Sequence, residues 1–99
     1  MNLPSAHHAG PRFKLGRILA TPGALEAITD VSASIVDLLI RHMRGNWGDV
    51  SDSDREQNER AITAGERLLS NFVLPGGGTV WIITEADRFA TTFLLPGEY

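Results

Sequence analysis

Residues 68–95 read LLSNFVLPGGGTVWIITEADRFATTFLL, and this stretch sets the fold class of the 99-residue chain. It contains three runs rich in β-branched, aromatic and leucine residues, over 68–74, 80–84 and 89–95. The turn-forming segments PGGG and EADR separate these runs, and closely spaced turns of this kind are typical of an antiparallel meander. We therefore predict a three-stranded antiparallel sheet in the last third of the chain.

The register of these strands predicts which side chains share a face. If both turns close symmetrically, Leu74 lies opposite Thr79 and Thr84 lies opposite Phe89. One face then carries Phe72, Trp81 and Thr92 beside Ser70, Ile83 and Ala90, and the other carries Val73, Val80 and Phe93 beside Leu69, Ile82 and Phe89. Both faces are apolar, and large apolar patches mark interfaces, so the face that the helical stripe from Val31 to Met43 leaves open needs the helix that begins at Thr21, or a second copy of the chain, to cover it. Of these two, we favour a homodimer.

The segment before the meander predicts one strand followed by a helix. Residues 14–20, KLGRILA, suit a short strand, which we expect at an edge of the sheet beside the meander. Thr21 and Pro22 begin a helix that ends near Asp30. A threonine cap satisfies exposed amides, and a proline at the first helical position loses no donor that the helix needs.

Two more helices are predicted before the meander. Apolar residues from Val31 to Met43 share one helical face with His42, and Ser32 or Ser34 caps this helix, which Gly45 ends. A polar surface helix follows and ends at Gly65. Two overlapping capping boxes can begin it: Ser51 with Asp54, and Ser53 with Glu56. The second is the better match, because its third position is a glutamate. The predicted fold class is α+β, with an N-terminal strand, two or three helices and a C-terminal three-stranded antiparallel meander.

Length and composition predict one globular domain. The 42% apolar and 21% charged residues are ordinary for such a domain, and residues 13–99 carry the periodic patterns. Residues 1–12, MNLPSAHHAGPR, have no periodicity and predict a flexible tail.

The most apolar run, Ile35–Ile40, contains Asp37 and is too short for a membrane helix, and no secretory signal is recognised. We expect a cytoplasmic protein with no membrane segment.

Several classes of chemistry are disfavoured. The chain has no cysteine, and its net charge of −3 argues against non-specific nucleic-acid binding. His42 lies on an apolar helical stripe, which is typical of a packing residue. The acids Asp49, Asp52 and Asp54 resemble the start of a calcium loop, but Gln57 and Arg60 break that pattern. We nominate no catalytic residue, metal site or cofactor.

Two polar loops are candidate partner-binding sites. Glu85, Asp87 and Arg88 cluster at a predicted hairpin tip, where they bind a partner or simply solubilise the turn. Trp47 and Asp49 lie in the loop between two helices. A loop tryptophan usually packs onto the domain as a lid, and a partner contact is the alternative.

Several segments together resemble a family of small bacterial proteins from plasmids and integrated mobile elements. Its members are called "plasmid-related protein" and are often labelled "type I restriction endonuclease subunit M". The resemblance covers Leu15 to Tyr99. It is carried by residues 19–25, Arg41-His42 with Gly45, Trp47-Gly48-Asp49, Asn58 with Gly65, residues 67–70, residues 81–88, Thr91-Thr92 and residues 94–96. It implies no established activity and no site residues.

The methyltransferase label conflicts with the residues. A DNA adenine methyltransferase needs a glycine-rich cofactor loop after a strand and a catalytic Asn/Asp-Pro-Pro-aromatic motif, and the chain has neither. The favoured hypothesis is an accessory protein of a mobile element that acts through protein–protein contacts. The alternatives are a small metal-dependent hydrolase or nuclease that uses Asp49, Glu85 or Asp87, and a regulator of restriction or DNA transfer.

Overall fold

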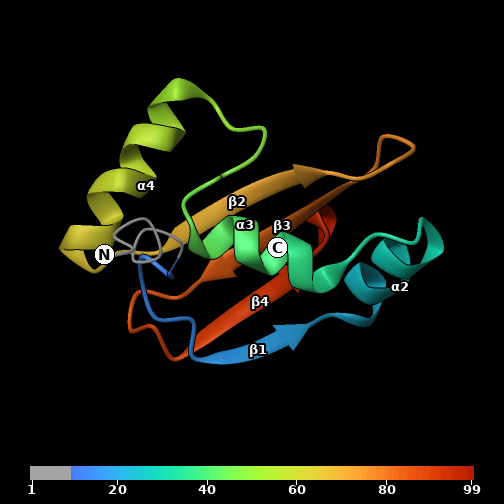
Figure 1. Cartoon of the computed structure of the whole chain (residues 1–99), viewed down its shortest axis with the longest axis horizontal. Helices are drawn as coiled ribbons and strands as arrows, with labels where there is room; N and C mark the ends of the chain where they lie inside the picture. Colours follow the sequence, from blue (N-terminus) through green and yellow to red (C-terminus); the bar gives the residue numbers. More distant parts are fainter. Residues whose placement is uncertain (1–9) are drawn as a thin grey trace, which may run out of the picture.

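The computed structural model describes residues 10–99, which form a four-stranded sheet and three α-helices (Figure 1). The elements in chain order are β1 (Arg17–Ala20), α2 (Pro22–Asp30), α3 (Ile35–Met43), α4 (Asp52–Ala64), β2 (Leu68–Val73), β3 (Thr79–Thr84), β4 (Ala90–Leu94) and the 3-10 helix η1 (Pro96–Glu98). This confirms the α+β class. Residues 1–9, most of the predicted tail, lie outside the described part of the chain.

Local capping interactions start the helices. The side chains of Thr21, Ser34 and Ser51 accept hydrogen bonds from the backbone amides of residues 24, 37 and 54, each three positions later. The preference for Ser53 as the cap of the polar helix is therefore wrong. Ser51 has the extended backbone that a cap requires, whereas Ser53 already lies in the first turn of α4.

The sheet is mixed. Its strand order is β1-β4-β3-β2, so the first strand lies at the edge beside the meander, as expected, but β1 runs parallel to β4. The four strands are thus not antiparallel throughout, although β2, β3 and β4 do form the predicted meander. Gly16 permits the close approach of β1, because it has a φ of +66° and a Cβ there would lie 2.3 Å from the backbone of Phe89.

The first hairpin is shifted by one residue from its predicted register. Val73, and not Leu74, pairs with Thr79. Leu74 instead donates a hydrogen bond to the carbonyl of Gly78 at 2.6 Å, so Gly78 belongs to the strand pair and the turn is one residue shorter than expected. A shift of one residue moves every side chain of β2 to the opposite face. Phe72 consequently lies beside Val80, and not beside Trp81.

The second hairpin also differs from its predicted register. Thr84 pairs with Thr91, and not with Phe89. This shift of two residues leaves the faces of β3 and β4 as predicted, because side chains alternate with a period of two. Trp81 and Thr92 therefore share one face, and Val80 and Phe93 share the other.

One face of the sheet, called here the helix-covered face, contains the main core. Ala24 and Ile28 of α2 and Leu38 of α3 pack on sheet residues of this face, which include Phe72, Leu74, Val80, Ile82 and Phe93. Figure 1 shows α2 and α3 on the same side of the sheet. The opposite face, called here the open face, is made by alternate residues of all four strands: Arg17, Leu19, Leu69, Asn71, Val73, Thr79, Trp81, Ile83, Ala90, Thr92 and Leu94.

The outer edge of β2 is covered by α4 and by the loop before it. Asn58 of α4 donates to the carbonyl of Leu69 at 2.8 Å and accepts from its amide at 3.2 Å. The backbone of Asn71 pairs with the loop before α4: its amide donates to the carbonyl of Trp47 at 2.9 Å, and its carbonyl accepts from the amide of Asp49 at 2.7 Å. In residues 10–99, no helix has the length and apolar character required to cross a membrane.

Candidate functional site

Trp47 is completely buried in a small second core. Its ring stacks on Phe13 with 6.0 Å between centroids and meets the ring of His42 edge to face. Ala61 of α4 and Leu68 of β2 complete the cluster. The indole therefore presents no surface to a partner, and its position is that of a lid packed onto the domain.

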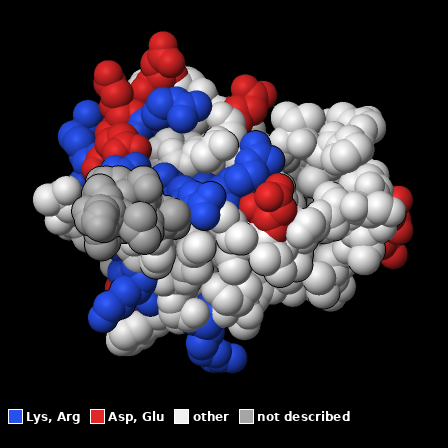
Figure 2. Space-filling view, viewed as in Figure 1, with Lys and Arg blue, Asp and Glu red and all other residues white. Residues whose placement is uncertain are grey.

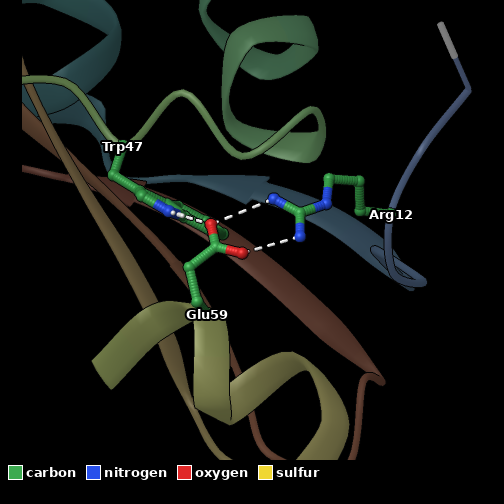
Figure 3. Close-up of polar contacts among 3 residues, drawn as sticks. All are labelled: Arg12, Trp47 and Glu59. Atoms are coloured by element: carbon green, nitrogen blue, oxygen red, sulfur yellow. Dashed lines mark hydrogen bonds and ion pairs between the residues drawn. The ribbon is translucent and has the colours of Figure 1, made fainter. Parts of the chain in front are cut away.

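The carboxylate of Glu59 in α4 bonds to both Trp47 and Arg12, and so links the loop before α4 to the start of the described chain (Figure 3). Glu59 accepts a hydrogen bond from the Trp47 indole at 3.0 Å and two from the Arg12 guanidinium at 2.7 and 3.0 Å. The bonds from Arg12 lower the pKa of Glu59, and the same bonds raise the pKa of Arg12. Arg12, the last residue of the predicted tail, is thus bound to the domain. The spacing of these three residues carries no sequence signal for the contact.

His42 lies at the centre of a buried chain of hydrogen bonds. Its Nδ1 is 2.6 Å from the Ser70 hydroxyl, and its Nε2 is 2.9 Å from the Thr84 hydroxyl. The Thr84 hydroxyl is 2.8 Å from that of Thr91, which donates to the carbonyl of Leu15 at 2.7 Å. The apolar helical stripe predicted a packing role for His42, and no sequence pattern indicated its hydroxyl partners.

The carbonyl at the end of this chain determines the direction of every hydrogen bond. A carbonyl only accepts, so the single hydroxyl hydrogen of Thr91 points to Leu15, and Thr84 must donate to Thr91. Thr84 then accepts from Nε2–H of His42, and Nδ1 accepts from Ser70. The network is complete with a neutral imidazole, and burial lowers the pKa of His42 to about 3.

This network lacks the features of a hydrolytic site. Ser70, His42 and Thr84 are all completely buried, so no substrate reaches the serine. Neither ring nitrogen of His42 contacts a carboxylate that could stabilise an imidazolium. The arrangement satisfies buried polar groups and joins α3 to β2, β3 and β4.

Arg88 at the β3–β4 turn is engaged within the fold. Its guanidinium donates to the carbonyls of Ala61 and Glu66, at 3.0 and 2.7 Å, and so joins the β3–β4 turn to the end of α4 and the residues after it. It also donates to the carbonyl of Glu85 at 3.0 Å. These contacts hold Arg88 at a φ of +63°, an uncommon value for a residue other than glycine.

The remaining candidates are exposed carboxylates on separate segments. Asp49 follows Trp47 at the β2 edge, whereas Glu85 and Asp87 lie at the β3–β4 turn. Asp87 accepts from the amide of Phe89 at 2.9 Å, as in many turns. Within residues 10–99, no group of three or more His, Cys, Asp or Glu side chains is arranged to hold a metal ion.

The open face of the sheet corresponds to the apolar face that we expected another helix or a second copy of the chain to cover. Val73 is 53% exposed and Leu19 is 39% exposed on this face. Part of its cover comes from Tyr99, itself 59% exposed, whose ring meets that of Trp81 at 5.9 Å and lies under the guanidinium of Arg67 at 5.0 Å. The one-residue error in the first hairpin assigned the wrong side chains of β2 to this face, because it placed Phe72 there and Val73 on the other side.

The side of the molecule that carries the helices differs from the open face in its charged side chains and its hollows. Figure 2 shows acidic and basic side chains next to one another over the α4 end and the centre of this side, whereas the α2 end is mostly uncharged. A shallow groove of about 620 Å³ is lined by residues 11–16 and Met43. A smaller one of about 210 Å³ lies between α4 and the start of β2.

No family model, curated protein or solved structure matches this chain. Its function is therefore inferred from the geometry described above.

Proposed function

We propose that this protein is a binding module without catalytic activity, which acts through protein–protein contacts made by the open face of its sheet. The observation that carries the proposal is the unequal cover of the two faces. Residues of α2 and α3 pack on one face, whereas Leu19, Val73 and Tyr99 are between 39% and 59% exposed on the other. Exposed apolar patches of this kind usually mark interaction sites.

The enzymatic alternative has less support. Asp49, Glu85 and Asp87 do not join a cluster of potential metal ligands among residues 10–99. His42, the histidine within residues 10–99, is completely buried. The resemblance to plasmid-related proteins supports a role as an accessory protein of a plasmid or mobile element, and such a role places the protein in the cytoplasm, where that DNA lies.

Two lysine substitutions at valines of similar exposure test this proposal. Val73 on the open face is 53% exposed, and Val36 on α3 is 61% exposed. The wild-type protein, Val73→Lys and Val36→Lys are immobilised and exposed to an extract of the protein's own host, and the captured proteins are quantified by mass spectrometry. We expect Val73→Lys to reduce recovery of a specific partner by about tenfold or more, since a buried lysine costs several kcal/mol. Val36→Lys should capture the partner as the wild type does.

Equal recovery by all three proteins would contradict the role of the open face. A thermal-shift measurement with added Mg²⁺ or Mn²⁺ distinguishes a metal-dependent enzyme from the proposed binding module. A stabilisation that is lost on Asp49→Asn or Asp87→Asn would favour a metal-dependent enzyme. Binding to DNA that weakens steeply with salt would favour a regulator of restriction or DNA transfer.

A further inference from the structure

The two outer strands of the sheet differ in whether other parts of the chain cover their free edges. The edge formed by β2 is covered by Asn58 and by the loop around Gly48, as described above. The edge formed by β1 has no neighbouring strand among residues 10–99. It contains no proline and no inward-facing charge, two of the devices by which proteins usually prevent edge pairing.

The hydrogen bonds of β1 identify the groups that this edge presents. The amides of Arg17 and Thr21 donate to the carbonyls of Phe89 and Phe93 on the β4 side. Because backbone groups alternate in direction along a strand, the N–H and C=O groups of Ile18 and Ala20 point away from β4. These outward groups are the ones that an additional strand would pair with.

We propose that β1 pairs with β1 of a second copy of this chain, antiparallel about a two-fold axis at Leu19. Ile18 then exchanges hydrogen bonds with Ala20 of the partner subunit, and Leu19 faces Leu19 of the partner subunit on the open side. Side chains of paired residues stay on matching faces in this register. The two sheets become one continuous sheet, and the open face extends across both copies.

Charge and apolar surface favour a second copy as the occupant. Arg17 lies opposite Thr21 of the partner subunit, so the cations of the two strands do not meet. Four of the seven large apolar side chains that are exposed in residues 10–99 lie on β1 or beside its ends: Ile18, Leu19, Leu25 and Phe89. Antiparallel pairing brings α2 of the partner subunit, which carries its Leu25, toward the end of β1 where Phe89 is 74% exposed.

The interface is small, and the dimer is therefore weak. One pair of four-residue strands buries less surface than the roughly 1,200 Å² of a stable complex. Association is expected at concentrations from about 10 to 500 µM. This proposal concerns the edge of the sheet and does not depend on the partner proposed for its open face.

Sedimentation velocity across this concentration range tests the proposal, with substitutions at the two-fold axis. The wild-type mass should rise from 10.8 kDa toward twice that value. Leu19→Lys and Leu19→Glu should each remain monomeric, because each places like charges opposite one another. An equimolar mixture of the two variants should associate again, since the lysine of one copy then faces the glutamate of the other. Val73→Lys, on the same face but at the far edge, should associate as the wild type does.

Three results would overturn the proposal. The first is a wild-type protein that stays at 10.8 kDa throughout the range. The second is a mixture of Leu19→Lys and Leu19→Glu that stays monomeric although both variants give the wild-type circular dichroism spectrum. The third is loss of association in Val73→Lys, which would show that the sheets meet face to face and not edge to edge.

Discussion

Lowering the pH from about 7.5 to about 5 should destabilise this protein by about 2 kcal/mol through His42 alone. Burial lowers the pKa of His42 to about 3, whereas a histidine in the unfolded chain titrates near about 6.5. Between these two values the unfolded state binds a proton that the folded state excludes. Acid therefore favours the unfolded state, and the stability associated with neutral His42 is fully present only above about pH 6.5.

The magnitude follows from the width of the titrated interval. Each pH unit below the unfolded pKa costs about 1.36 kcal/mol, so the interval from about 6.5 to 5 gives about 2 kcal/mol. Glu59, whose pKa is lowered by Arg12, contributes stability that is present above its ordinary pKa of 4.5 and is lost only at lower pH.

Urea denaturation of the wild type and of His42→Gln at both pH values measures this effect. The glutamine amide can accept from Ser70 and donate to Thr84, as the imidazole does, but it does not titrate. We expect the free energy of unfolding of the wild type to fall by about 2 kcal/mol more than that of the variant. An equal fall in both proteins would refute the role of His42. NMR of the histidine ring should also show the Nε2–H tautomer, which the direction of the hydrogen bonds requires.

Two further substitutions test contacts that hold the loops. Arg88→Ala should lower the free energy of unfolding by about 1 kcal/mol, because the carbonyl of Glu66 loses its donor while that of Ala61 keeps the amides of Gly65 and Glu66, and urea denaturation measures the change. Gly48→Ala should lower the melting temperature far more than Gly76→Ala. Both glycines have positive φ, but only at Gly48 would a Cβ meet another atom, the carbonyl oxygen of Asn71 at 2.2 Å. Similar melting temperatures for the two alanine variants would contradict the close packing of the loop on β2.

Much of the secondary structure could be predicted because the interactions that produce it are local. Thr21 and Ser34 cap the amides three residues later, and that spacing is visible in the sequence. The alternation of apolar residues identified the three strands of the meander, and the turn residues separated them. The edge position of the first strand was also predicted correctly.

The register of the strands could not be obtained in this way. Whether Gly78 belongs to the turn or to the strand changes which face Phe72 occupies, and a run of three glycines permits either arrangement. The symmetric closure that the sequence suggested therefore assigned the side chains of β2 to the wrong faces. The exposed positions of Val73 and Leu19 on one open face became visible only when the registers of both hairpins and of β1 were known.

The contacts of the predicted site residues also depend on tertiary structure. Trp47 bonds to Glu59, twelve residues away, and His42 bonds to Ser70 and Thr84, 28 and 42 residues away. Capping spacings and periodicities describe neighbours on one helix or strand, so they carry no information about partners at these separations. The positions of the helices and strands follow from the sequence alone, because short-range hydrogen bonds and apolar periodicity act within each element. The packing of those elements decided which polar groups meet, because a buried donor or acceptor must find a partner wherever the fold places one.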